Sequence, residues 1–151
     1  ALPIYLTLVS SHGHDKLTKK GIHFTTPVDI TIKPNVVKTC EDVQTKPDIV
    51  VVAGKITADE IAKIRPLIGR DTIIMCYQNG VDAGKAYQEA FPNNPVVVSS
   101  ISVQIRSDEK VSGALQMPKE IGWPLGPVES RFDNDPRLVA LAEAKIGRAH
   151  V

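Results

Sequence analysis

Short apolar runs alternate along this chain with segments of helical periodicity. Apolar or β-branched runs predict strands at 4–9, 28–32, 49–53, 72–77, 96–105 and 111–117, with a further short apolar segment at 121–126. The first of these runs is expected to be buried. Val28, Ile30 and Ile32 alternate with polar residues, which predicts a strand with one face buried. The unbroken run at 49–53 is typical of a parallel strand that is covered on both faces.

The clearest helix start lies directly after the run at 49–53. Thr57-x-x-Glu60 is a capping box, in which the hydroxyl and the carboxylate satisfy free amides at the helix N-terminus. Isoleucines at 61, 64 and 68 then share one face. Pro66 predicts a kink or an early end of this helix, and Gly69 suits its termination.

Two further helices follow in the pattern. Asp82 can cap a helix whose small and aromatic residues share a face up to Phe91. Asp135-Pro136 opens the last helix with proline in the favoured first position. Strands that alternate with short helices indicate βαβ units, an α/β fold class and a largely parallel sheet.

Composition narrows the classes of function. The chain has 151 residues, of which 42% are hydrophobic, and a formal net charge of +1. This length suits one domain, and the near-neutral charge gives no support for nucleic-acid binding. No apolar run approaches the roughly 20 residues of a membrane helix. Two cysteines, Cys40 and Cys76, do not make a disulfide scaffold, so we expect a reducing, cytoplasmic setting.

Polar residues follow three of the predicted strands, where ligands bind in open α/β sheets. After 4–9, no acidic residue precedes Asp15, and lysines follow at 16, 19 and 20. This favours a ribose 2′-phosphate over a free 2′-hydroxyl, and hence NADP. The alternative is a solvated loop. His12-x-His14-Asp15 could hold a metal, but a surface turn is favoured and no metal is expected.

The other two strand ends carry Gly54-Lys55 and Gln78-Asn79-Gly80. Lys55 can reach a phosphate or a carboxylate, or it is an exposed loop lysine. Asn79 offers a donor and an acceptor that could orient a ribose hydroxyl or a substrate carbonyl, and Gly80 lets the backbone approach a ligand. The alternative is a turn whose asparagine is satisfied locally. A hairpin at Asn-Gly is disfavoured because a helical pattern follows.

Taken in order, these segments resemble the ketopantoate reductase (2-dehydropantoate 2-reductase) family over roughly residues 2–127. Residues 6–9 with the polar loop and Gly21-Ile22 resemble the family's second strand and its loop. Residues 48–55 resemble its strand that ends in lysine, and 78–81 its Gln-Asn-Gly segment. Residues 96–105 and 121–122 resemble the strands that close its nucleotide domain.

The resemblance implies a doubly wound, Rossmann-like NADP-binding domain and carries over particular roles. The family's cofactor-contacting lysine falls on Lys55, and its cofactor- and substrate-contacting asparagine on Asn79, next to Gly80. A backbone contact to the cofactor falls near Ile105. The family usually has an arginine where this chain has Ser10 and Ser11, so binding of a 2′-phosphate beside Ser11 would rest on His12 or Lys16.

Two family features have no counterpart in this sequence. No G-x-G-x-x-G pattern occurs, and residues 128–151 are too few for the family's helical domain with its lysine general acid. No catalytic residue is therefore assigned. Without the first strand, the order 3-2-1-4-5-6 would leave a gap of ~10 Å at the centre of the sheet, with unpaired edges on both sides. We expect the chain alone to fold poorly or to rearrange.

The resemblance implies an NADPH-dependent reductase of ketopantoate, or of a similar 2-oxo acid, in the pantothenate pathway. A related hydroxy-acid dehydrogenase is the nearest enzymatic alternative, and a non-catalytic nucleotide-binding or interaction module is the other. We expect residues 1–127 to form a partial nucleotide-binding domain and 128–145 to begin a linker helix. Residues 146–151 can be encoded by a common sequencing-adapter sequence, so a non-native tail is expected there.

Overall fold

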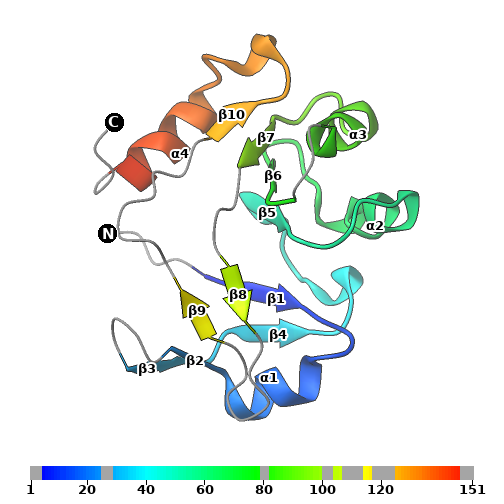
Figure 1. The fold of residues 1–151 in the computed structure, drawn as a ribbon. Coiled ribbons are helices and arrows are strands. Elements are labelled where there is room, and N and C mark those ends of the chain that lie inside the picture. The colour runs from blue at the N-terminus through cyan, green and yellow to red at the C-terminus, as the bar shows by residue number, and fades with distance from the viewer. Residues whose placement is uncertain are drawn as a thin grey trace. The chain divides into compact units, whose positions relative to one another are not determined.

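A computed structural model describes residues 5–24, 29–78, 82–99, 104–106, 114–116 and 125–146. The chain divides into two compact units, residues 1–45 and 46–151 (Figure 1). Each unit is described below by itself. No helix in the described ranges is long and apolar enough to cross a membrane.

The first unit is built from short elements. They are β1 (Thr7–Val9), α1 (His14–Lys20), β2 (Ile22–Phe24), β3 (Ile30–Ile32), β4 (Asn35–Val37) and the 3-10 turn η1 (Cys40–Asp42). β1 pairs in parallel with β4, and β2 pairs antiparallel with β3. The sequence pattern predicted β1 and β3 but missed their partners β2 and β4, which are only three residues long.

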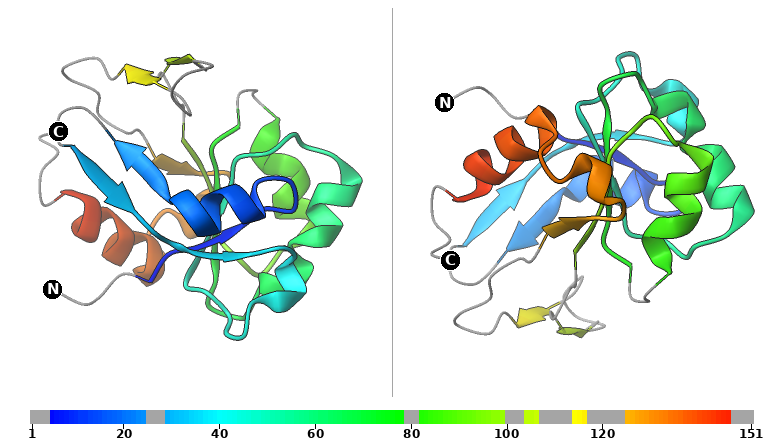
Figure 2. Two further views of the ribbon diagram at one scale, coloured as in Figure 1. Left: turned by 90° about the horizontal axis from the view of Figure 1, so that it is seen from below. Right: turned by 90° about the horizontal axis from the view of Figure 1, so that it is seen from above.

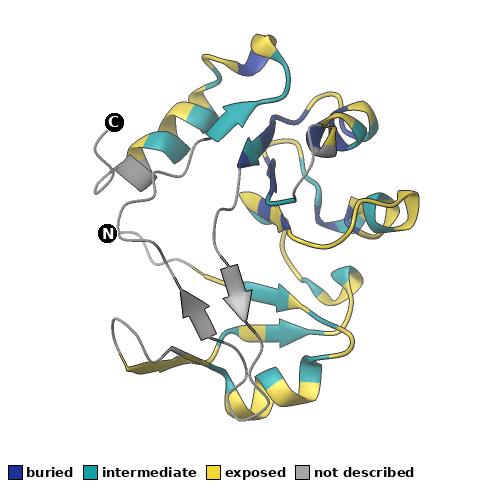
Figure 3. Ribbon diagram, in the orientation of Figure 1, coloured by how far each residue is buried: buried dark blue, intermediate teal, exposed yellow. Residues whose placement is uncertain are grey.

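No described residue of the first unit is buried (Figure 3). Leu6 and Val9 are 54% and 41% exposed, so the prediction that the first apolar run is buried was wrong. Ile30 and Ile32 are also exposed, which contradicts a half-buried strand, and Val28 lies outside the described residues. Both failures have one cause, because a two-stranded sheet offers too little surface to cover its own side chains.

The second unit contains a four-stranded sheet. Its strands are β5 (Ile49–Val52), β6 (Ile73–Cys76), β7 (Val96–Ser99) and β10 (Leu125–Pro127), in the order β10-β7-β6-β5. β5, β6 and β7 are parallel, and β10 runs antiparallel to β7. The predicted strand at 96–105 therefore ends at Ser99 in this sheet, and β8 (Gln104–Arg106) instead pairs with β9 (Ala114–Gln116).

The predicted helices are present. They are α2 (Ala58–Lys63), α3 (Ala83–Ala90) and α4 (Pro136–Ile146), with 3-10 turns η2 (Arg65–Leu67) and η3 (Ser130–Phe132). Thr57 caps α2 by accepting a hydrogen bond from the Glu60 amide at 3.1 Å. The Glu60 carboxylate pairs with Lys63 at 2.5 Å, so the Thr57 half of the predicted capping box forms and the carboxylate half does not. α2 ends before Pro66, as predicted.

One capping prediction was wrong. Asp82 occupies the N-cap position of α3, but its side chain makes no capping hydrogen bond. Its carboxylate instead pairs with the Lys85 ammonium at 2.8 Å, one helical turn away. This exposed pair raises the pKa of Lys85.

The sheet of the second unit is covered by helices on both faces (Figure 2). Successive residues of a strand point to opposite faces. On one face Ile73, Met75 and Val97 form a buried cluster against Leu138 and Leu141 of α4. On the other, Val52, Ile74, Cys76 and Val96 face α2 and α3, where Tyr87 and Phe91 are buried.

β5 is the exception to this coverage. Val50 and Val52 are buried, but Ile49 and Val51 on the opposite face are 37% and 57% exposed. The prediction that both faces of this run are covered was therefore wrong in the structure. α4 covers β6, β7 and β10, and no described helix of the unit packs over the outer residues of β5.

One parallel strand in each unit lies at the edge of its own sheet. β1 has a single partner, β4, and β5 has a single partner, β6. Each is an edge strand within the described part of the chain. The gap that the sequence predicts at the centre of the sheet stays a prediction.

Candidate functional site at the carboxyl ends of β5 and β6

The parallel register places the ends of β5 and β6 side by side. Val52 is the register partner of Cys76, and the Tyr77 amide donates to the Val52 carbonyl at 2.9 Å. The segments that leave these strands, Gly54-Lys55 and Gln78-Asn79-Gly80, therefore start from adjacent points of one sheet edge. This is the edge at which ligands bind in open α/β sheets.

Lys55 lies in the loop between β5 and α2 and is exposed. Within the described part of the chain its ammonium takes part in no ion pair or hydrogen bond. Gly54 before it has ordinary backbone geometry, and an added Cβ would meet only the Glu60 carboxylate, at 3.9 Å. The loop thus presents an exposed positive charge beside the end of β5, which suits an anionic ligand.

Gln78 joins the ends of the two strands through its side chain. Its Nε2 donates to the carbonyl of Gly54. The same nitrogen lies 3.5 Å from the phenol oxygen of Tyr87, which comes from α3. Tyr87 is fully buried, and burial raises the pKa of its phenol. Asn79 and Gly80, the predicted ligand contacts that follow, lie outside the described residues.

Two buried polar atoms at this end of the sheet have no hydrogen-bond partner in the described structure. They are Oε1 of Gln78 and Oγ of Ser99, the last residue of β7. Buried acceptors and hydroxyls normally have partners in folded proteins. Oε1 of Gln78 can only accept a hydrogen bond, and the Ser99 hydroxyl can donate or accept one. The exposed Lys55 ammonium is the group at this edge whose charge fits a phosphate.

The predicted 2′-phosphate region lies in the first unit, between β1 and α1. The Ser11 hydroxyl lies 3.0 Å from Nδ1 of His12, and the Ser10 hydroxyl accepts from the Gly13 amide at 3.1 Å. His14 bonds to Asp15 at 3.0 Å. That contact, with the charge of Lys38, lowers the pKa of Asp15. Among the described residues, no group of three histidine, cysteine or acidic side chains could hold a metal ion.

Ile105 lies in β8, where its backbone is the register partner of Leu115 in β9. The structure thus places it in a two-stranded ribbon, and not in the four-stranded sheet that carries Lys55.

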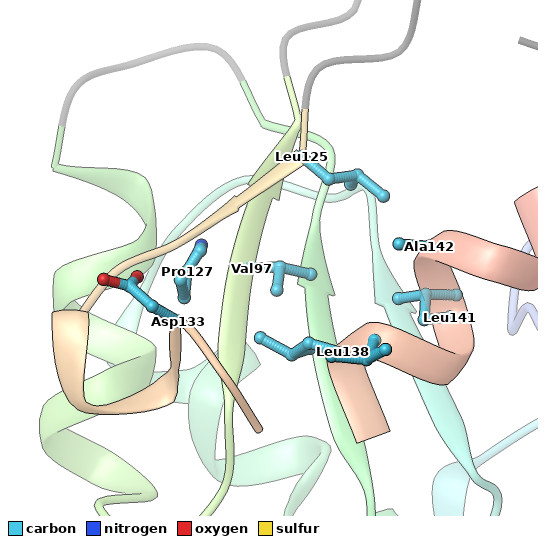
Figure 4. A pocket seen from close by; sticks show the side chains of 8 residues that line it. Val97, Leu125, Pro127, Asp133, Leu138, Leu141 and Ala142 are labelled. Atoms are coloured by element: carbon cyan, nitrogen blue, oxygen red, sulfur yellow. The ribbon is translucent and has the colours of Figure 1, made fainter. Parts of the chain in front are cut away.

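An apolar cavity of about 200 Å³ lies between α4 and strands β7 and β10 (Figure 4). Val97, Leu125, Leu138 and Leu141 line it, and among its described lining residues Asp133 is the charged one. Such a lining suits packing against apolar groups and offers nothing to hold a phosphate.

The sequence pattern did not single out three residues that the structure brings to this edge: the side chain of Gln78, Tyr87 as its partner, and Ser99. The sequence shows that Gln78 follows an apolar run. Its contact with Gly54 spans 24 positions, however, and could be predicted only from the register of β5 and β6. Tyr87 was expected only as part of an apolar helix face.

The comparisons with known proteins agree with this geometry. The family described as "Ketopantoate reductase PanE/ApbA" matches residues 4–123. The solved structure of 2-dehydropantoate 2-reductase from Methylococcus capsulatus has a TM-score of 0.70 and 24% identity, over 96% of this chain and 48% of that one. The corresponding enzyme from Porphyromonas gingivalis W83 has a TM-score of 0.72 and 22% identity, over 97% of this chain and 53% of that one.

The chain therefore spans about half the length of the solved structures that it matches. At these identities the structural likeness shows a shared Rossmann-like α/β fold. No curated protein matches the sequence significantly.

Proposed function

Because the chain belongs to the ketopantoate reductase family, we propose that the protein is an NADPH-dependent reductase. Its substrate in this proposal is ketopantoate (2-dehydropantoate) or a similar small 2-oxo acid, and its product is the 2-hydroxy acid, in pantothenate biosynthesis. We place it in the cytoplasm, in keeping with Cys40 and Cys76, which are not joined by a disulfide.

The observation that carries the proposal is the exposed Lys55 ammonium at the carboxyl end of β5, directly beside the end of β6. A dinucleotide presents phosphates and ribose hydroxyls at such an edge. An ammonium group without a protein partner is available to both, because it is a point charge with three donors.

Each chain residue has a defined part in this proposal. Lys55 binds the cofactor through its ammonium, and Asn79 orients the nicotinamide ribose and the keto group of the substrate. Gly80 leaves room for the backbone to approach the cofactor, and the backbone near Ile105 gives a further contact. In the first unit, Ser11 hydrogen-bonds the 2′-phosphate. When bound, NADPH supplies the hydride, and none of these residues is assigned the proton donor.

The test replaces Lys55 by Ala in the protein made from the complete reading frame and follows NADPH consumption with ketopantoate. Loss of a hydrogen bond from a charged group should lower kcat/KM by about 10-fold to 100-fold. Lys63→Ala is the matched control. Lys63 is 64% exposed and pairs with Glu60 on α2, so its loss should leave kcat/KM unchanged. A protein that oxidises no NADPH, or a Lys55→Ala variant with full activity, would exclude the proposal.

Cofactor binding by the 151-residue chain alone distinguishes the enzyme hypothesis from that of a non-catalytic nucleotide-binding module. The chain contains no glycine-rich phosphate loop, whose amides hold a pyrophosphate. We expect titration of this chain with NADPH to give no tight binding. Micromolar affinity would favour a binding module that works without that loop.

A further inference from the structure

We propose that Gln78 is a positioning residue, whose side-chain amide fixes the loop that carries Lys55. The inference rests on the proposed function, since it assigns Lys55 to the cofactor. It concerns a different residue, however, and a contact within the protein that does not depend on any ligand.

The contact itself defines the orientation of the amide. The Gly54 carbonyl can only accept a hydrogen bond, so the atom of Gln78 that faces it must be the Nε2 donor. Gly54 is the residue directly before Lys55, and this bond crosses from the end of β6 to the loop after β5. Among the described residues, it is the side-chain hydrogen bond that ties this loop to the neighbouring strand.

The same nitrogen of the carboxamide also lies close to a buried side chain of the unit. Nε2 lies 3.5 Å from the phenol oxygen of Tyr87, which is 0% exposed in α3. This distance is at the limit of a hydrogen bond. The contact places the Gln78 side chain on the α3 side of the sheet, and the bond to the Gly54 carbonyl is the closer of the two.

Stability alone does not explain a glutamine at this position. Its Oε1 is buried and has no donor partner in the described structure, which destabilises a fold. Methionine has nearly the same length and would avoid this penalty. Gly54, by contrast, is exposed, so water could satisfy its carbonyl if Gln78 were absent. The amide of Gln78 thus adds little to the stability of the fold, and its effect is to fix the position of the Lys55 loop.

The first experiment needs no cofactor. Gln78→Met in the full-length protein should speed hydrogen exchange of the amides from Lys55 to Thr57, while the melting temperature stays within error of the parent value. Tyr87→Phe is the matched control, because it removes only the phenol oxygen and keeps the bond to Gly54. Unchanged loop exchange in Gln78→Met would overturn the proposal. So would equal loop exchange in Tyr87→Phe, since the anchor would then be α3.

The second experiment is a double-mutant cycle on NADPH binding and turnover. Gln78→Met should raise the KM for NADPH about fivefold to tenfold, the effect of one hydrogen bond, with a smaller change in kcat. In a Lys55→Met background the same substitution should change KM by less than about twofold, because its effect passes through Lys55. Multiplicative effects of the two substitutions would overturn the positioning role. If Lys55→Met itself does not change KM or kcat, the proposed function fails. The hydrogen-exchange experiment still tests whether Gln78 positions the Lys55 loop.

Discussion

The two units of this chain contain similar strands but differ in what covers them. In the first unit, β1 and β4 form a parallel pair that packs beside α1, and none of the described residues of this unit is buried. β5, β6 and β7 of the second unit are also parallel, but α2 and α3 cover one face and α4 much of the other. The same type of strand is thus exposed in one unit and forms the core of the other.

The difference shows that burial is set by neighbours and not by the apolar run itself. Residues 4–9 and 72–77 have similar patterns, yet Leu6 is 54% exposed and Ile74 is 0% exposed. Parallel strands are stable when both faces are covered, and two-stranded sheets are marginal. We infer that the second unit contributes most of the free energy of unfolding of this chain. The sheet edge beside Lys55 belongs to this stable unit.

The largest expected effect separates the two units by one matched substitution. Ile74→Ala removes a fully buried side chain from β6 and should destabilise the second unit by about 2–5 kcal/mol. Ile32→Ala in β3, where the residue is 43% exposed, should change stability by about 0.5 kcal/mol or less. Denaturant unfolding followed by circular dichroism measures both. Equal losses would mean that the first unit has a core of its own.

The next effect concerns how closely α3 packs in the second unit. A Cβ at Gly84 would lie 2.3 Å from Cγ2 of Val128, a stiff β-branched side chain. Gly84→Ala should therefore destabilise the unit by about 1–3 kcal/mol, as overpacking does. Val128→Ala in the same protein should restore part of the loss. If Gly84→Ala is neutral in thermal unfolding, this packing is looser than described.

A pair of asparagines sharpens the comparison further. The buried Asn94 donates at 2.8 Å to the carbonyls of Gly69 and Thr72, whereas the exposed Asn35 donates at 3.3 Å to Thr7. Asn94→Ala leaves carbonyls without their donor and should cost about 1–3 kcal/mol. Asn35→Ala should lie within about 0.5 kcal/mol of the parent chain. A larger effect at Asn35 in denaturant unfolding would reverse the ranking of the units.

The smallest expected effect is a difference in the labelling rates of the two native cysteines. Burial raises the pKa of the Cys76 thiol to about 12, so it stays protonated at neutral and mildly alkaline pH. The thiolate is the reactive form, so Cys76 should react with a thiol reagent only when the second unit opens. Cys40 in the first unit is partly exposed and should react sooner. Mass spectrometry of the labelled peptides gives the order, and faster labelling of Cys76 would contradict it.

Local signals in the sequence predicted the second unit well. The Thr57 cap, the end of α2 before Pro66 and the start of α4 at Pro136 depend on residues within one helical turn. The unbroken apolar run of β6 is long enough to identify by itself. The positions of Lys55 and Gln78 at strand ends followed from these elements.

Features that depend on distant residues could not be predicted in the same way. β2 and β4 are three residues long and carry too little pattern. The exposure of Ile49 and Val51 depends on where α4 packs, and the bond from Gln78 to Gly54 depends on strand register. Asn94 lies in the loop between α3 and β7, and its amide joins that loop to the turn before β6 through residues more than 20 positions away.

The most direct test of this account is native-state hydrogen exchange of the 151-residue chain, resolved by amide. The account predicts that amides of β6 and β7 are the most protected and exchange only through global opening of the second unit. Amides of β1 and β4 should exchange at rates near those of an unfolded chain. Equal protection in both units would contradict it, because the first unit would then have a stable core of its own.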